Sequence, residues 1–233
     1  MFDPAGPLDG AARMDVSDID IDGNVREYLG LREPEARHTS YAYCFNYFRD
    51  FVVADRLTDL VDPDNLEKSC LELGFYLASW GMMRGSSPLL GRSLRSLVPT
   101  LKVLAASPAD MWALDVQDYS PSNIERILAL GRDIRATLHA GASDILLSKI
   151  MLGTMGCVPA FDTNFKSGLP GAGFGPKGLR RVSEFYAKNR AAIEAHRVPT
   201  LDFSSGQPTS YRYTQAKVVD MIFFVQGSSP RMT

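Results

Sequence analysis

The sequence predicts an all-α protein, a single domain of about eight helices. From about Thr39 onward, apolar residues recur at spacings of three and four, which is the period of an amphipathic helix. Few segments show the alternation of polar and apolar residues that is typical of a half-buried strand. The chain has 233 residues, 45% of them hydrophobic and 22% charged, which suits one compact globular domain.

The first three predicted helices share a strongly apolar face. The spacing of aromatic residues predicts a helix over 41–52. A second helix begins at Asp62-Pro63-Asp64, which supply a cap and a first turn, and ends at Arg84-Gly85. A third is expected over 88–104, after a capping serine and a proline, with a kink at Pro99.

The second half of the chain predicts five more helices. Ser122-Asn123-Ile124-Glu125 opens the first of them. The next is much more apolar, so we expect it to be central. Between the last two helices, residues 198–207 allow at most a short extended piece at Leu201-Asp202-Phe203. The five helices are predicted at 122–138, at 143–155, from Asp162, at 179–195 and at 211–225, with a loop over 168–178.

The formal net charge of −2 conceals an uneven distribution. Residues 1–35 contain nine acidic and three basic side chains, so they carry −6 and the rest of the chain carries +4. We therefore expect an acidic, partly flexible N-terminal arm over 1–35 and a single all-α domain over 36–233. Residues 1–12, rich in Gly, Pro and Asp, should be its mobile part. The acidity fits a solvated tail or an autoinhibitory mimic of phosphate.

Composition also argues against several classes of protein. The sequence has no run of about 18 apolar residues, and no signal peptide follows Met1. The cysteines lie in apolar stretches, and neither they nor the histidines show metal-ligand spacing. We therefore expect a cytoplasmic protein with reduced cysteines, no membrane span and no metal site. The residues concerned are Cys44, Cys70, Cys157, His38, His139 and His196.

Residues 139–169 carry the clearest chemical signal. The small-residue hairpin Gly141-Ala142-Ser143 leads directly into the apolar helix predicted at 143–155. Free backbone N–H groups at such a helix start, together with the helix dipole, favour an anion such as phosphate. The helix ends at Gly156, and the rigid Pro159-Ala160 turn then places Asp162 at the start of another helix.

This stretch resembles the helix-hairpin-helix DNA glycosylase superfamily over about 30 residues. In that family a Leu-Pro-Gly-x-Gly hairpin precedes an apolar helix that ends in glycine, and a Pro-Ala turn leads to Val-Asp-Thr-His. Gly141 matches the first hairpin glycine, Ser143 replaces the second, and Gly156 matches the helix-ending glycine. Phe161-Asp162-Thr163 matches Val-Asp-Thr. His139-Ala140 replaces Leu-Pro, and Asn164 replaces the histidine.

The resemblance implies a DNA glycosylase-like fold and an N-glycosylase that releases a damaged or modified base, with Asp162 as its functional carboxylate. Breaking an N-glycosidic bond develops positive charge on the sugar, which a fixed carboxylate stabilises. Bifunctional members carry a Schiff-base lysine near the position of Ile145, so a monofunctional enzyme is expected. The alternative is a lysine shifted to Lys149, which lies one helical turn later, about 6 Å along the axis. No four-cysteine iron–sulfur pattern is present, and we expect no cofactor.

A glycosylase must hold its displaced base in a pocket of aromatic and polar side chains. Tyr76, Trp80 and Arg84 follow one another at helical spacing and are the candidates for this pocket. Each has a plainer interpretation. Trp80 falls on the apolar period of a core helix, Arg84-Gly85 is a common helix ending, and Asp162 has the position of an ordinary N-cap.

A basic segment follows the motif and favours a DNA partner. Residues 166–190 carry six basic side chains and one acidic side chain, a net charge of +5. Gly171–Gly175 is not a nucleotide loop, because no strand precedes it and no Lys-Ser/Thr pair follows. A non-catalytic DNA-binding or accessory protein of DNA modification or defence is the alternative, and a partner-binding helical protein is a third possibility. The DNA-contacting candidates besides the hairpin are Lys166, Lys177, Arg180 and Arg181.

Overall fold

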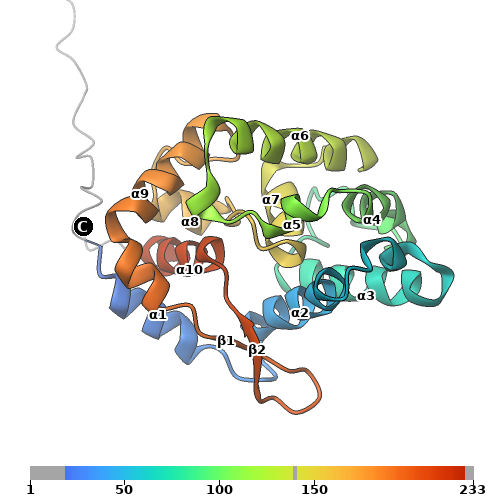
Figure 1. Cartoon of the computed structure of the whole chain (residues 1–233), viewed down its shortest axis with the longest axis horizontal. Helices are drawn as coiled ribbons and strands as arrows, with labels where there is room; N and C mark the ends of the chain where they lie inside the picture. Colours follow the sequence, from blue (N-terminus) through green and yellow to red (C-terminus); the bar gives the residue numbers. More distant parts are fainter. Residues whose placement is uncertain (1–18, 139–140, 229–233) are drawn as a thin grey trace, which may run out of the picture.

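The computed structural model describes residues 19–138 and 141–228. This part of the chain forms ten α-helices, several short 3₁₀ helices and one two-stranded sheet (Figure 1), which confirms the all-α class. The described part contains no helix that is both long and apolar enough to cross a membrane. The expected mobile segment 1–12 and the hairpin residues His139-Ala140 lie outside the described residues.

The α-helices are α1 (Ile21–Gly30), α2 (Ser40–Val53), α3 (Pro63–Ser79), α4 (Val98–Ala105), α5 (Ala109–Ala113), α6 (Pro121–Thr137), α7 (Asp144–Thr154), α8 (Thr163–Gly168), α9 (Pro176–Ala195) and α10 (Gln215–Ser228). The 3₁₀ helices are Arg37–Thr39, Leu57–Val61, Leu94–Leu97 and Val116–Asp118, and the strands are β1 (Pro199–Leu201) and β2 (Pro208–Arg212).

The helices form two groups, each around one buried helix. Helices α1, α8 and α9 pack on α10, whereas α2 and α3 pack on α7. Helix α6 contacts α4, α7 and α9 and so bridges the two groups along one side (Figure 1). Every residue of α7 from Leu146 to Thr154 is buried, as the apolar sequence of this segment predicts.

Part of the acidic segment belongs to the folded body rather than to an arm. Asp20 caps α1, and Val25 and Tyr28 of that helix are fully buried. The acidic residues Asp22 and Glu27 of α1 are exposed, so the net charge of this segment conceals an amphipathic helix. The expected division of the chain at residue 35 does not follow the structure.

The third predicted helix was wrong in its extent. Turns occupy residues 86–93, and a 3₁₀ helix precedes α4, which begins only at Val98. Pro99 therefore lies in the first turn of α4, where its missing N–H costs nothing, and it kinks no helix. The sequence also missed the short helix α5, and it allowed only one extended piece where β1 pairs with β2 in antiparallel fashion.

Two glycines bring α8 against the backbone of α10. A Cβ atom added at Gly168 would overlap the carbonyl oxygen of Phe223, and one added at Gly227 would overlap the carbonyl oxygen of Asn164. The two helices therefore cross in backbone contact, which only glycine allows. This contact fixes the position of α8, the helix that begins after Asp162.

Candidate functional site

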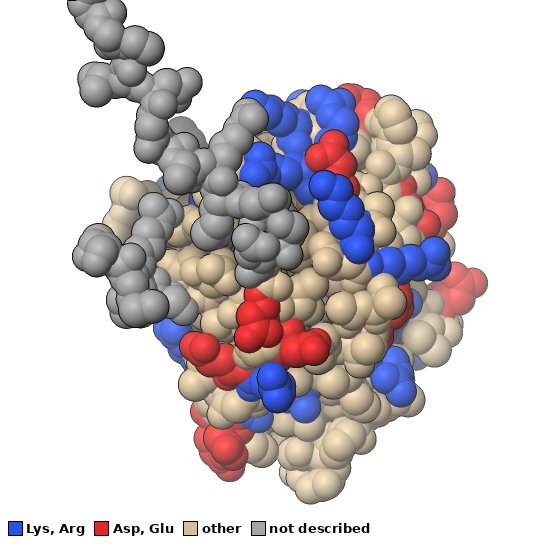
Figure 2. Space-filling view, turned by 90° about the vertical axis from the view of Figure 1, so that its left-hand side faces the viewer, with Lys and Arg blue, Asp and Glu red and all other residues tan. Residues whose placement is uncertain are grey.

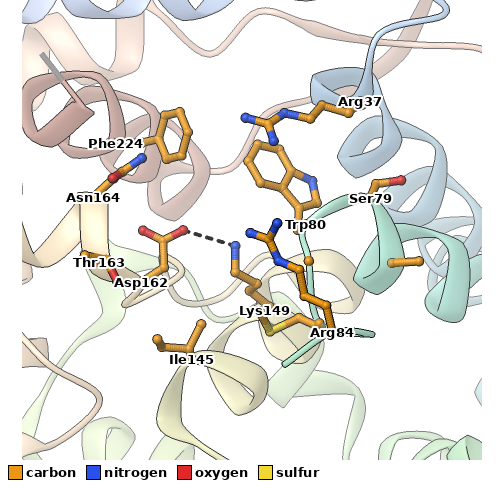
Figure 3. Close-up of a pocket in the computed structure, with 13 residues that line it drawn as sticks. Arg37, Ser79, Trp80, Arg84, Ile145, Lys149, Asp162, Thr163, Asn164 and Phe224 are labelled. Carbon is orange, nitrogen blue, oxygen red and sulfur yellow. Dashed lines mark hydrogen bonds and ion pairs between the residues drawn. The ribbon is translucent and has the colours of Figure 1, made fainter. Parts of the chain in front are cut away.

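A pocket of about 410 Å³ opens where the two groups of helices meet (Figure 3). Its walls come from the 3₁₀ helix before α2, the end of α3 and the following turn, α7, the start of α8, and α10. The lining residues are Arg37, Ala78, Ser79, Trp80, Gly81, Met82, Arg84, Ile145, Lys149, Asp162, Thr163, Asn164 and Phe224.

Asp162 is both the N-cap of α8 and a wall of this pocket. Its Oδ1 accepts a hydrogen bond from the backbone N–H of Phe165 (3.0 Å), as an N-cap does. Its Oδ2 accepts one from the Lys149 ammonium (3.1 Å), drawn as the dashed line in Figure 3. The side chain is 18% exposed, so the carboxylate is accessible from the pocket. Asp162 can therefore be an ordinary N-cap and at the same time present a carboxylate oxygen to the pocket.

The loop before Asp162 is held from three sides. The Ser148 hydroxyl accepts the N–H of Phe161 (3.1 Å), and the Asp220 carboxylate accepts the N–H of Ala160 (2.9 Å). The Tyr119 hydroxyl donates to the carbonyl of Cys157 (2.6 Å). Gly156 turns the chain with a positive φ of 69°, and a Cβ there would lie 2.6 Å from the methyl group of Thr214. These contacts fix the backbone that carries Asp162.

Lys149 is a buried cation on an apolar helix. Its side chain is only 4% exposed, and its Nζ lies 4.9 Å from the centre of the Trp80 ring. The ion pair with Asp162 and the aromatic face together compensate for the lost hydration of the ammonium. Ile145, one turn earlier, lines the same pocket, so both positions considered for a lysine face it.

Trp80 is surrounded by cations and aromatic rings. The guanidinium of Arg37 lies 5.4 Å from the ring centre, in addition to the Lys149 ammonium. The rings of His38 and Phe224 contact the Trp80 ring edge-on. The indole N–H is buried and has no hydrogen-bond partner among the described residues. Trp80 is therefore half-buried: it packs against the core and also lines the pocket, with charged groups next to its ring.

Arg84 reaches the pocket from a turn rather than from a helix face. Helix α3 ends at Ser79, earlier than the predicted Arg84-Gly85. Gly81 then adopts a positive φ of 75°, and the Arg84 side chain folds over it, with Nε only 2.7 Å from where a Cβ at Gly81 would be. The helical spacing of Trp80 and Arg84 was therefore the wrong reason for placing them together, although both line the pocket.

Tyr76 does not line the pocket. Its side chain is 2% exposed, and its ring occupies the space that a Cβ at Gly153 of α7 would need. It also packs edge-on against Tyr41. Tyr76 therefore belongs to the contact between α3 and α7, and its assignment to a base pocket is corrected.

A second buried ion pair lies behind Trp80. The Lys217 ammonium donates to the Asp220 carboxylate (2.8 Å) and to the Tyr28 hydroxyl (2.9 Å), and it lies 5.7 Å from the Trp80 ring centre. His38 packs against the same ring. Burial, assisted by the positive charges of Arg37 and Lys217, lowers the pKa of His38 to about 4. His38 is therefore neutral at pH 7.

The predicted hairpin joins α6 to α7. Gly141 is exposed with a φ of 98°, Ala142 is buried, and the Ser143 hydroxyl caps α7 by accepting the N–H of Leu146 (3.3 Å). Arg135 of α6 donates to the carbonyl of Ala142 (2.6 Å) and pairs with Asp144. This contact ties the hairpin to α6.

The basic candidates lie outside the pocket lining. Lys166 on α8 and Lys177 and Arg180 on α9 are exposed, whereas Arg181 is half-buried with a buried Nε that lacks a partner among the described residues. Figure 2 views the side of the molecule where α9 and α1 lie in Figure 1. Basic side chains gather in its upper part and acidic side chains lie below them.

Several residues of the pocket were not among those predicted from the sequence. A lysine within an otherwise apolar helix signals a buried, paired charge, and this signal would have selected Lys149 over Ile145. Arg37 and Phe224 carry no comparable signal, because only the fold brings them to Asp162. Asn164 lies two residues after Asp162 and was considered only as the replacement for the histidine of the family motif.

No protein-family model, curated protein or solved structure matches this chain. Within residues 19–138 and 141–228, no group of three His, Cys, Asp or Glu side chains is placed to hold a metal ion. The function must therefore be argued from the pocket itself.

Proposed function

We propose that this chain is a DNA glycosylase-like enzyme of the helix-hairpin-helix superfamily, a monofunctional N-glycosylase that releases a damaged or modified base from DNA. The observation that carries this proposal is the position of Asp162. The residue that the resemblance selects as the functional carboxylate lies in a pocket together with Trp80 and Arg84.

In this proposal Asp162 stabilises the oxocarbenium-like sugar that forms as the N-glycosidic bond breaks. One of its oxygens is held by the helix cap and the other by Lys149, so the carboxylate has a fixed direction before substrate binds. Such preorganisation is what an electrostatic role requires. Asn164 and Ser79, on opposite walls, offer polar atoms for the edge of a displaced base (Figure 3).

The hairpin and the basic side chains supply the proposed DNA contacts. The N-terminus of α7 after Gly141-Ala142-Ser143 would bind a backbone phosphate, and Lys166, Lys177, Arg180 and Arg181 would add sequence-independent affinity. These contacts position the strand and do not select the base.

The test is incubation of the purified chain with DNA oligonucleotides, each carrying one damaged or modified base, followed by mass spectrometry of released bases. The proposal expects release of at least one base, and strand cleavage only after hot alkali, which breaks the abasic site. Strand cleavage without alkali would replace the monofunctional assignment with a lyase in which Lys149 is the nucleophile. No release from any oligonucleotide, together with salt-dependent DNA binding, would favour the non-catalytic DNA-binding alternative.

A further inference from the structure

The charged groups of the pocket are unbalanced. Three cations, Arg37, Arg84 and Lys149, line it together with one acidic residue, Asp162. Asp162 pairs with Lys149, and within the described part of the chain neither arginine forms a salt bridge or a side-chain hydrogen bond. Two positive charges therefore lie at the pocket without a salt-bridge partner among residues 19–138 and 141–228.

Both arginines are held at the pocket although both are exposed. Arg37 lies over the Trp80 ring at 5.4 Å, and Arg84 folds over Gly81, whose positive φ and missing Cβ make room for it. In Figure 3 both arginine side chains enter from the side of the pocket opposite Asp162, and the Trp80 ring lies between their guanidinium groups. An arginine that served only solubility would extend into water, where it is best hydrated. These two side chains instead lie against the wall of the pocket.

We propose that the ligand of this pocket carries an oxyanion, a carboxylate or a phosphate, which Arg37 and Arg84 bind. Guanidinium groups bind both oxyanions through paired, charge-assisted hydrogen bonds. That the ligand is a nucleotide rests on the proposed function, whereas its negative charge rests on the arginines alone. The oxyanion is either an acidic substituent on a modified base or the phosphate of the target nucleotide.

The experiment measures binding of free ligands to the full chain by isothermal titration calorimetry. The probes are the four 2′-deoxynucleosides, their 5′-monophosphates, and 5-carboxy-2′-deoxycytidine. We expect at least one anionic probe to bind about tenfold or more tightly than its neutral nucleoside, since a charge-assisted hydrogen bond contributes about a factor of ten. A preference for the monophosphates assigns the site to phosphate, and a preference for the carboxylated nucleoside assigns it to an acidic base.

The variants Arg37→Gln and Arg84→Gln should each remove most of this preference. Arg92→Gln is the matched control, because Arg92 is exposed and does not line the pocket. The inference is overturned if no anionic probe binds more tightly than its neutral nucleoside, or if both pocket variants keep the preference. Base release from DNA is a separate readout. Release of a neutral base without any anion preference would support the proposed function and overturn this inference. An anion preference without base release would support this inference and count against the proposed function.

Discussion

At the scale of single residues, Asp162 and Lys149 differ in how much they depend on each other. The Lys149 side chain is 4% exposed and the Asp162 side chain is 18% exposed. A buried charge that loses its partner costs more than one that water can still reach. The aspartate can be hydrated from the pocket, whereas the partners of the ammonium within the described part of the chain are Asp162 and the face of Trp80.

We therefore predict an asymmetric effect on stability. Asp162→Asn keeps an N-cap, because asparagine caps helices as well as aspartate does, but it leaves Lys149 unpaired and should cost about 3 kcal/mol. Lys149→Met should cost less, about 1 kcal/mol, since Asp162 remains accessible to water. Urea unfolding of both variants and of the double variant measures these costs and the coupling between the residues. Equal costs for the two variants would contradict the predicted asymmetry, and a coupling near zero would contradict the ion pair.

The neutral His38 makes stability depend on pH. Its folded-state pKa of about 4 lies below the ordinary value near 6.5, so between these values the unfolded chain binds a proton that the native chain does not. The contribution is therefore fully present above pH 6.5 and is lost as the pH falls toward 4, by up to about 3 kcal/mol. Relative to the wild type, His38→Phe should lose less stability between pH 7 and pH 4.5 in urea unfolding. Parallel losses in both proteins would show that His38 does not carry this effect.

At the scale of elements, the placement of Asp162 depends on the backbone contact between α8 and α10. A methyl group at Gly227 would overlap the carbonyl of Asn164, so Gly227→Ala must shift α8. We predict a loss of about 1 to 3 kcal/mol and slower base release, because overpacking displaces the helix that follows the carboxylate. Gly30→Ala is the control. Nothing lies within 4 Å of that position, and alanine in a helix should be neutral or stabilise by up to about 1 kcal/mol. Thermal unfolding of both variants tests this, and equal effects would argue against the backbone contact.

The sequence predicted helices well where their apolar period was uninterrupted. Helices α2, α3, α6, α7, α8, α9 and α10 each coincide largely with a predicted segment. Helices α2 and α6 extend beyond the predicted bounds by one residue, whereas α9 begins and α10 ends three residues outside them. The serine and proline at 86–88 resemble a helix start but lie in a series of turns between α3 and the 3₁₀ helix Leu94–Leu97. Helix α1 was missed because its acidic side chains suggested a solvated tail, although Val25 and Tyr28 keep the helical spacing. Local signals predict elements, but they do not decide which apolar face meets the core.

At the scale of the whole molecule, the pocket could be predicted only in part. Asp162, Trp80 and Arg84 were selected from the sequence and lie together. Arg37, from a distant segment, was not selected, since only the folded chain brings it to these residues. Tyr76 was selected from helical spacing, but spacing alone cannot tell which side of α3 faces α7 and which faces the pocket.

The distribution of charge over the molecule predicts how DNA binding depends on salt. If the basic side chains of α8 and α9 contact phosphates, reversing Lys177 and Arg180 to glutamate should weaken binding to any duplex. The slope of log affinity against log salt concentration should fall by about 2. The control is Lys102→Glu on α4, on the other side of the molecule from α9 (Figure 1). Fluorescence anisotropy with two unrelated duplexes measures both, and equal losses for the two changes would argue against a DNA-binding face on α9.

The most direct test of the central claim is the single-turnover rate of base release, measured with the wild type and with Asp162→Asn on the best oligonucleotide of the panel. The substitution keeps the helix cap and removes the charge, so the rate should fall by about a hundredfold or more while circular dichroism confirms a folded chain at the assay temperature. The same rate from a folded Asp162→Asn variant would contradict a catalytic role for this carboxylate.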